Sequence, residues 1–238
     1  MSFLFFNPNL IVNKRDMLTT GIVYLPIGLC YVSNVLKKNN INHKVIDLFG
    51  NNPNNIQKLE NNFMFLGDAV EKFDIDIKNT NAIFIYANQV INHLSIIDLK
   101  NKIRAIKSDI KIFFFENTQA VTAYSLKDLK NEFIKSENDY IIIGDPEFKI
   151  KKICKNILSD QNINKNYLIS QNTSSINDRE INYDIEELGY PNWDCIPIKN
   201  YWKIGHAHGP QSSKKYLSIL SSRGCPYPCN FCIIPETS

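Results

Sequence analysis

The sequence predicts an α/β protein whose residues 1–160 form a doubly wound parallel sheet. Short apolar runs recur along this stretch, and most are followed by a segment with apolar residues at helical spacing. The connections between them are short. Strands that alternate with amphipathic helices in this way favour a parallel sheet with helices on both faces. The composition agrees, because 44% hydrophobic and 21% charged residues are ordinary for a folded globular protein.

Five apolar runs are predicted as strands. They are rich in Phe, Ile, Val and Tyr, and residues such as Asn-Pro or Gly-Asp end them, which is typical of buried parallel strands that break into loops. The runs are Ser2 to Pro8, Asn42 to Phe49, Asn81 to Ala87, Ile110 to Asn117 and Asp139 to Asp145.

Five further segments are predicted as helices. In the first of them, Ile27, Tyr31 and Val35 recur at helical spacing behind Pro26, a residue favoured in a first helical turn. The segments are Tyr24 to Asn40, Ile56 to Phe73, His93 to Lys107, Ser125 to Lys135 and Phe148 to Leu158.

Ligands of doubly wound sheets bind where loops leave the carboxyl ends of the strands. No GxGxxG follows the first strand and no GxxxxGK[ST] is present, so the sequence disfavours a dinucleotide and a nucleoside triphosphate. Asp47 ends the second strand, where a ribose-binding acid can stand. Without the glycines, we interpret Asp47 as a loop cap.

The charge, the start of the chain and the cysteines bear on the protein's partners and its location in the cell. The net charge is +3 and the lysines are spread along the chain, which gives no argument for nucleic acid as a partner. The apolar start is interrupted at Asn7 and Pro8 and has no basic leader, so we predict neither a signal peptide nor a membrane span. Six unevenly placed cysteines favour a reducing, cytoplasmic location.

Three of the six cysteines, Cys225, Cys229 and Cys232, have the spacing CxxxCxxC. Gaps this short bring three thiolates of one loop onto a single inorganic centre. Zinc is one alternative, but a structural zinc site takes four N or S ligands, usually as two close pairs. Three cysteines are expected when a four-iron cluster keeps one iron open, since a fourth cysteine normally closes an electron-transfer cluster.

The stretch RGCPYPCNFC, residues 223–232, resembles the cluster loop of radical S-adenosylmethionine (SAM) enzymes. In that family the cysteines hold a 4Fe-4S cluster that binds SAM and cleaves it to a 5′-deoxyadenosyl radical. The resemblance implies Cys225, Cys229 and Cys232 as metal ligands and Phe231 beside the cluster or the adenine, with plain loop packing an equal alternative for Phe231. It also implies a small-molecule substrate and an electron donor such as a flavodoxin or ferredoxin.

The front of the chain resembles the Rossmann-like cobalamin-binding domain that precedes the radical SAM domain in many such enzymes. The segments that carry this resemblance are YLPIGLCYVSNVLKKNN, HKVIDL and DYIIIGDPE. It implies that cobalamin would lie over the carboxyl edge of the sheet, near Asn7, Asn88, Asn117 and Gly144. Glu147 matches a loop usually written Gly-Glu-x-Glu, from which Asp145 departs. A role in the fold is an equal alternative for Gly144, as a backbone turn, and for Glu147, as a helix cap.

Cobalamin domains that place a protein histidine on cobalt carry an Asp-x-His-x-x-Gly loop. None of His43, His93, His206 and His208 lies in such a setting. We therefore expect any cobalamin to be bound without a protein histidine ligand. The alternative is a domain that keeps the fold and has lost the cofactor.

Residues 161–213 are predicted as a linker and connector, with QNTSSINDRE as the clearest linker. Glu186 to Trp202 resembles the family's connector, which reads Leu-Pro-x-Pro-x-Trp-Asp. Pro191, Trp193 and Asp194 match it, while Gly189 replaces the first proline. We interpret Trp193 as a buried anchor of this connector.

The pair His206 and His208 can chelate a metal, although an exposed Gly/Pro loop is the more ordinary interpretation of that stretch. Residues 214–238 are predicted as the start of a radical SAM (β/α) barrel. Its first strand, Tyr216 to Ser221, would deliver the cysteine loop at its carboxyl end. The rest of the family's SAM-binding barrel would follow, so we expect this chain to be the front part of a longer enzyme and inactive alone.

The resemblance thus implies a radical SAM enzyme with a 4Fe-4S cluster, SAM and cobalamin. The reaction classes it implies are methyl transfer, and radical cyclisation or rearrangement. One alternative is a radical SAM protein with a cobalamin-free front domain. The other is a non-catalytic Rossmann-like module with a structural zinc tail.

Overall fold

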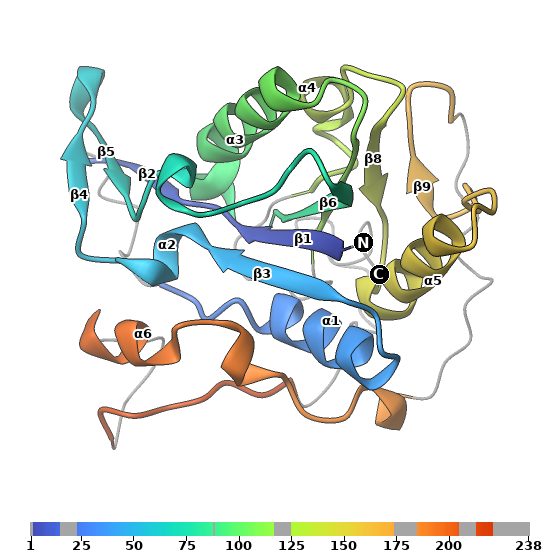
Figure 1. The fold of residues 1–238 in the computed structure, drawn as a ribbon. Coiled ribbons are helices and arrows are strands. Elements are labelled where there is room, and N and C mark those ends of the chain that lie inside the picture. Colours follow the sequence, from blue (N-terminus) through green and yellow to red (C-terminus); the bar gives the residue numbers. More distant parts are fainter. Residues whose placement is uncertain are drawn as a thin grey trace, which may run out of the picture.

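A computed structural model describes residues 2–14, 23–87, 89–116, 125–173, 185–204 and 213–220. Its centre is a six-stranded sheet of order β3-β1-β6-β7-β8-β9, with helices on both faces (Figure 1). The strands are β1 (Ser2–Asn7), β3 (His43–Asp47), β6 (Thr80–Tyr86), β7 (Lys111–Phe115), β8 (Asp139–Ile142) and β9 (Leu168–Ile169).

The predicted α/β class and all five predicted strands are confirmed, with strand ends that differ by a few residues. The sheet is mixed, because β9 pairs antiparallel with β8 while the other neighbours are parallel. β9 comes from the stretch assigned to the linker, so the sheet extends beyond residue 160. In chain order the five parallel strands are arranged 2-1-3-4-5, and the order reverses between β1 and β6. Such a reversal is the topological switch point of a doubly wound sheet.

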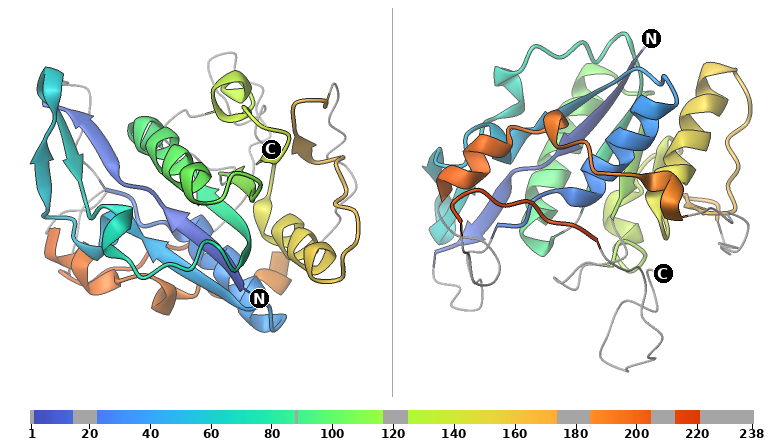
Figure 2. Two further views of the ribbon diagram at one scale, coloured as in Figure 1. Left: turned by 45° about the horizontal axis from the view of Figure 1, so that its top comes forward. Right: turned by 90° about the horizontal axis from the view of Figure 1, so that it is seen from below.

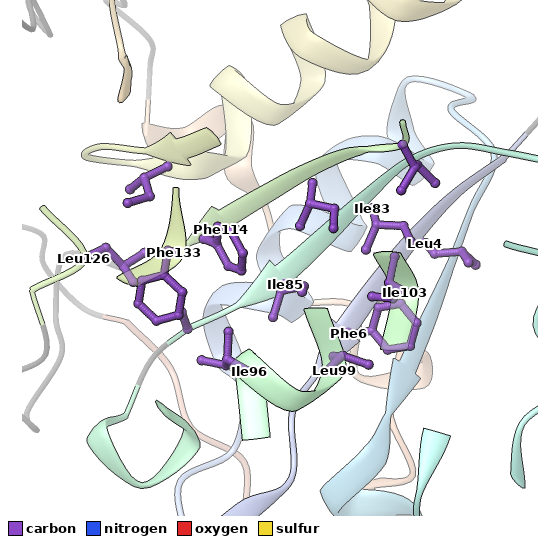
Figure 3. Packing of buried hydrophobic residues seen from close by; sticks show 14 of the residues in the cluster. Leu4, Phe6, Ile83, Ile85, Ile96, Leu99, Ile103, Phe114, Leu126 and Phe133 are labelled. Carbon is purple, nitrogen blue, oxygen red and sulfur yellow. The ribbon is translucent and has the colours of Figure 1, made fainter. Parts of the chain in front are cut away.

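Both faces of the sheet are buried, which explains why its strands are continuous apolar runs. Along β1, Leu4 and Phe6 point to one face and Phe3 and Phe5 to the other. The first face packs on α3 (His93–Ile106) and the short α4 (Lys130–Phe133), as Figure 3 shows. The second face packs on α1 (Ile27–Lys38) and α5 (Pro146–Leu158).

Four of the five predicted helices are present. The one expected over Ser125 to Lys135 is shorter, because residues 126–129 form turns before α4. The helix predicted over Ile56 to Phe73 is wrong. That stretch forms the hairpin β4 (Ile56–Lys58) and β5 (Phe63–Leu66), which joins β2 (Leu10–Asn13) in a three-stranded antiparallel sheet.

Two asparagines at the tip of the hairpin explain the error. Asn61 and Asn62, in the 3-10 turn η1 (Glu60–Asn62), have φ of 56° and 64°. This left-handed region is one that asparagine tolerates better than most residues, and consecutive residues there end an α-helix. The short η2 (Val70–Lys72) follows the hairpin.

The connector packs along the sheet domain. It consists of η5 (Ile185–Leu188), η6 (Trp193–Cys195) and α6 (Ile198–Ile204), and it runs beside α1 and the short α2 (Leu48–Asn51) (Figures 1 and 2). Trp193, predicted as buried, is half-buried and packs against two apolar clusters. The described part of the predicted barrel strand, within residues 213–220, forms neither helix nor strand. Within the described ranges, no helix is both long and apolar enough to cross a membrane.

Candidate functional site

A small hollow lies at the switch point, where β1 and β6 end side by side. Asn7 from the end of β1, Tyr86 from the end of β6 and Gln89 from the following loop line it, together with Pro26 just before α1. A crevice at this place is where doubly wound sheets bind ligands. The carboxyl edge of the sheet is therefore the candidate site. The chemistry of its side chains determines which class of ligand it can bind.

Asp47, at the end of β3, is the centre of a buried hydrogen-bond network. Asn7 Nδ2 and the Gly50 N–H each donate to Asp47 Oδ1 at 2.7 Å, and the Tyr201 hydroxyl donates to Oδ2 at 2.7 Å. Burial raises the pKa of Asp47, while these three donors act in the opposite direction. The prediction that Asp47 is a loop cap is confirmed, because its side chain caps α2.

Tyr201 brings the connector into this network. Its side chain comes from α6 and is completely buried, and its hydroxyl also accepts from Asn7 Nδ2 at 3.1 Å. Gly50 allows the close packing, since a Cβ atom there would collide with Asp47 and with the Tyr201 ring. The amide nitrogen of Asn7 is thus directed into the protein, while the residue still lines the hollow.

Tyr86 has a buried hydroxyl that finds no hydrogen-bond partner within the described ranges. Its ring packs against Phe115, and its oxygen lies near the Gly28 N–H in the first turn of α1, without the alignment of a hydrogen bond. Burial raises the pKa of Tyr86, and the nearby acidic groups, including Glu147, raise it further. The hollow is also lined by Pro26, which precedes α1, and α1 has no side-chain cap among the described residues.

Glu116, directly after β7, is a second buried polar group in this region. It is 3% exposed, and its Oε2 has no hydrogen-bond partner among the residues that the structure describes. Removal from water raises the pKa of Glu116 to about 8, with a smaller contribution from the negative charge of Asp128. At neutral pH the carboxyl is therefore largely protonated and can donate a hydrogen bond.

Gly144 and Glu147 lie between β8 and α5. Gly144 has φ of 69°, a left-handed turn that favours glycine, so its backbone role in the fold is evident. Glu147 is completely buried in the first turn of α5 and close enough to Tyr86 for its charge to raise the pKa of that hydroxyl. The structure thus brings Asn7 and Glu147 to the same edge of the sheet.

Sequence reasoning missed Glu116, Tyr86 and Tyr201 as site residues. Glu116 and Tyr86 stand in predicted strands that end at this edge, which was the available signal. Tyr201 meets Asp47 across 154 residues of chain, and no local pattern announces such a contact.

The other predicted residues lie outside the described part of the chain, namely Asn88, Asn117, Phe231, Cys225, Cys229, Cys232, His206 and His208. Among the described residues, no group of three or more His, Cys, Asp or Glu side chains is arranged to hold a metal ion. The described histidines are both engaged. His43 contacts Ser33 Oγ at 2.9 Å near the amino end of β3, and His93 Nε2 lies 2.8 Å from Glu132 Oε2.

Comparison of the chain with protein-family models, curated proteins and solved structures finds no match in any of the three.

Proposed function

We propose that this chain belongs to a radical SAM enzyme, in which the cysteine loop holds a 4Fe-4S cluster and the sheet domain binds cobalamin at its carboxyl edge. The observation that carries the proposal is the CxxxCxxC spacing of Cys225, Cys229 and Cys232 within RGCPYPCNFC. Three thiolates from one loop leave one iron of a four-iron cluster open for a substrate. When bound, these cofactors supply the radical and methyl-transfer chemistry, and the protein positions them.

The chemistry of the carboxyl edge supports a large neutral ligand. The corrin ring of cobalamin carries amide groups around its rim, and these need partners that bring no buried charge. Tyr86 Oη and Glu116 Oε2 are buried atoms without partners in the described part of the chain, and Glu116 is largely protonated at neutral pH. Such neutral groups can bond amides without the cost of burying an ion.

The described histidines support binding without a protein ligand to cobalt. His43 stands near the amino end of β3, at the opposite edge of the sheet, and His93 is engaged by Glu132. A metal-binding imidazole needs a free nitrogen and an oriented partner on the other one. The end of β1 carries Asn7, whose amide nitrogen is already bonded to Asp47 and Tyr201, and no imidazole.

The first experiment tests the cluster. Anaerobic incubation with iron and sulfide should give a brown chain with about four irons, and replacing Cys225, Cys229 or Cys232 with alanine should abolish iron uptake. Cys154→Ala is the matched control, because Cys154 is a buried core residue of α5. Equal iron content in all four variants would contradict the proposal. A colourless chain that binds zinc would support the zinc-tail alternative.

The second experiment tests cobalamin. Titration with hydroxocobalamin, followed by visible absorption, should show binding that Tyr86→Phe and Glu116→Leu each weaken about tenfold, the effect of losing roughly one hydrogen bond. Tyr140→Phe, in the amino half of β8, is the matched control and should bind normally. No binding at all would favour a cobalamin-free front domain. Axial nitrogen splitting in the cobalt(II) spectrum that disappears on replacing a histidine would contradict the ligation proposed.

A further inference from the structure

Cys30 and Cys195 bring two thiols into contact across most of the chain. Cys30 stands in the first turns of α1, Cys195 in η6 of the connector, and their sulfur atoms are 3.8 Å apart. Cys30 is completely buried and Cys195 is half-buried. The third described cysteine, Cys154, lies in α5 and is buried in a different apolar cluster, so among the described cysteines the contact is specific to one pair.

The backbone on both sides of this pair is held in place by hydrogen bonds. The Asn192 N–H donates to the Cys30 carbonyl at 3.0 Å, and Asn192 Nδ2 donates to Ser33 Oγ at 3.0 Å. Further along α1, Asn34 Nδ2 donates to the Leu188 carbonyl at 2.6 Å. The two sulfurs therefore meet because α1 and the connector are docked. A disulfide bond of about 2.0 Å needs only a small further approach of the side chains.

We infer that Cys30 and Cys195 are a site of reversible oxidation, at which a disulfide bond fastens the connector onto α1. The two thiols are suited to different roles. Cys195 is the more exposed residue of the pair, so its thiol is the one that we expect a peroxide to oxidise first. Cys30 is shielded, and its contact with Cys195 together with burial raises the pKa of the Cys30 thiol, which keeps it protonated until it reacts.

The oxidation balances with hydrogen peroxide as the oxidant. The Cys195 thiolate attacks one peroxide oxygen, the O–O bond breaks, and the departing hydroxide takes a proton, leaving a sulfenic acid on Cys195. The Cys30 sulfur then attacks Cys195 Sγ and loses its proton, while the sulfenic hydroxyl leaves as water. Two thiols and one peroxide thus give one disulfide and two waters, and a small-molecule thiol reverses the step by exchange.

The disulfide acts on the carboxyl edge through Tyr201. The connector that carries Cys195 continues directly into α6, whose Tyr201 hydroxyl is bonded to Asp47 and Asn7. With the sulfurs joined, the connector stays docked and Tyr201 stays in the network. With the thiols free, only non-covalent contacts hold the connector on α1. This inference does not depend on the proposed function, since it uses neither the cysteine loop nor cobalamin.

The test uses the full chain, treated with hydrogen peroxide or with dithiothreitol and then with an alkylating reagent. Peptide mapping of the peroxide-treated chain should find the Cys30 peptide linked to the Cys195 peptide, with both thiols protected from alkylation. Limited trypsin digestion should cleave the connector at least tenfold more slowly than in the reduced chain. Dithiothreitol should restore both thiols.

Two variants separate the pair from other cysteines. Cys195→Ser changes the half-buried partner and should remove the linked peptide and the trypsin protection, while Cys154→Ser should keep both. Because Cys195 is half-buried, we expect its substitution to leave the fold intact, and circular dichroism checks this. Alkylation of both thiols after peroxide treatment, or a sulfinic acid on Cys195 without a link, would overturn the inference. Equal protection of wild type and Cys195→Ser would overturn it as well.

Discussion

The two edges of the six-stranded sheet bury acidic side chains in opposite ways. At the amino edge, Asp139 is completely buried and fully paired, with Lys100 Nζ at 2.7 Å and Arg104 Nη2 at 2.5 Å. The N–H groups of Lys135 and Ser136 also donate to it. At the carboxyl edge, among the described residues, no lysine or arginine pairs with Asp47 or Glu116.

Buried polar atoms that lack a hydrogen-bond partner also differ in number between the two edges. Four buried side-chain atoms of the described residues lack a partner, and three belong to Tyr86, Glu116 and Tyr167. Tyr86 ends β6, Glu116 directly follows β7, and the Tyr167 carbonyl accepts from the Ile143 N–H just after β8. The fourth is Arg104 Nε, whose other nitrogens are bonded. The comparison teaches that the amino edge pairs its buried acid with cations, while the carboxyl edge keeps buried polar atoms that have no partner among the described residues, at a cost in stability.

Breaking the amino-edge network should have the largest effect on stability. Asp139→Asn leaves Lys100 and Arg104 buried without a counter-charge, which we expect to lower the free energy of unfolding by about 3–5 kcal/mol. Urea unfolding followed by circular dichroism measures it. Asp98→Asn is the control, because Asp98 is half exposed and pairs with Lys102 at the surface, where the loss should stay below about 1 kcal/mol. Similar losses in both variants would remove the distinction between the edges.

Glu116 should make stability fall as pH rises. Its folded-state pKa, raised to about 8, exceeds the ordinary value of 4.5, so the folded chain retains a proton that the unfolded chain releases. The stabilisation is complete below the lower value and is lost as pH rises towards the upper one, by at most about 1.4 kcal/mol per unit. Between about pH 5.5 and pH 7.5, wild type should therefore lose about 2 kcal/mol relative to Glu116→Gln. Parallel pH profiles in urea would contradict this.

Tyr201→Phe should have an intermediate effect. The change leaves Asp47 Oδ2 without its donor inside the protein, which we expect to cost about 1–2 kcal/mol and to loosen α6. Hydrogen exchange measured by mass spectrometry should show faster exchange in α6 and unchanged exchange in α3. Tyr216→Phe, which involves a half-buried tyrosine near the connector, is the control.

Tyr86→Phe should have the smallest effect on stability. Its hydroxyl has no hydrogen-bond partner among the described residues, so removing it should leave the free energy of unfolding within about 0.5 kcal/mol of wild type or slightly raise it. Thermal unfolding measures this, and the tenfold loss of cobalamin affinity expected above should appear in the same variant. A large destabilisation would show that the hydroxyl is bonded within the fold.

The strands could be predicted from sequence because burial on both faces makes each of them a continuous apolar run, as in Phe113 to Phe115. The hairpin could not, because Ile56 to Phe73 has apolar residues that also fit a helix. The left-handed backbone of Asn61 and Asn62 is what decides between the two. Asp47 was interpreted correctly from its place at a strand end. The hydrogen bond from Tyr201 to Asp47 forms only because the connector docks on the sheet domain. The unpartnered oxygen of Glu116 results from burial by elements distant in sequence. Neither feature therefore has a local sequence pattern.

The two outermost strands of the six-stranded sheet also bear on how the protein behaves at high concentration. An open strand edge can pair with the edge of another molecule and so begin an aggregate. Here β9 closes the β8 side with only two residues, and it runs antiparallel to the rest. On the other side, β3 exposes Lys44, whose charge opposes the approach of a second sheet. A two-residue strand and one lysine thus protect the most apolar part of the chain from self-association.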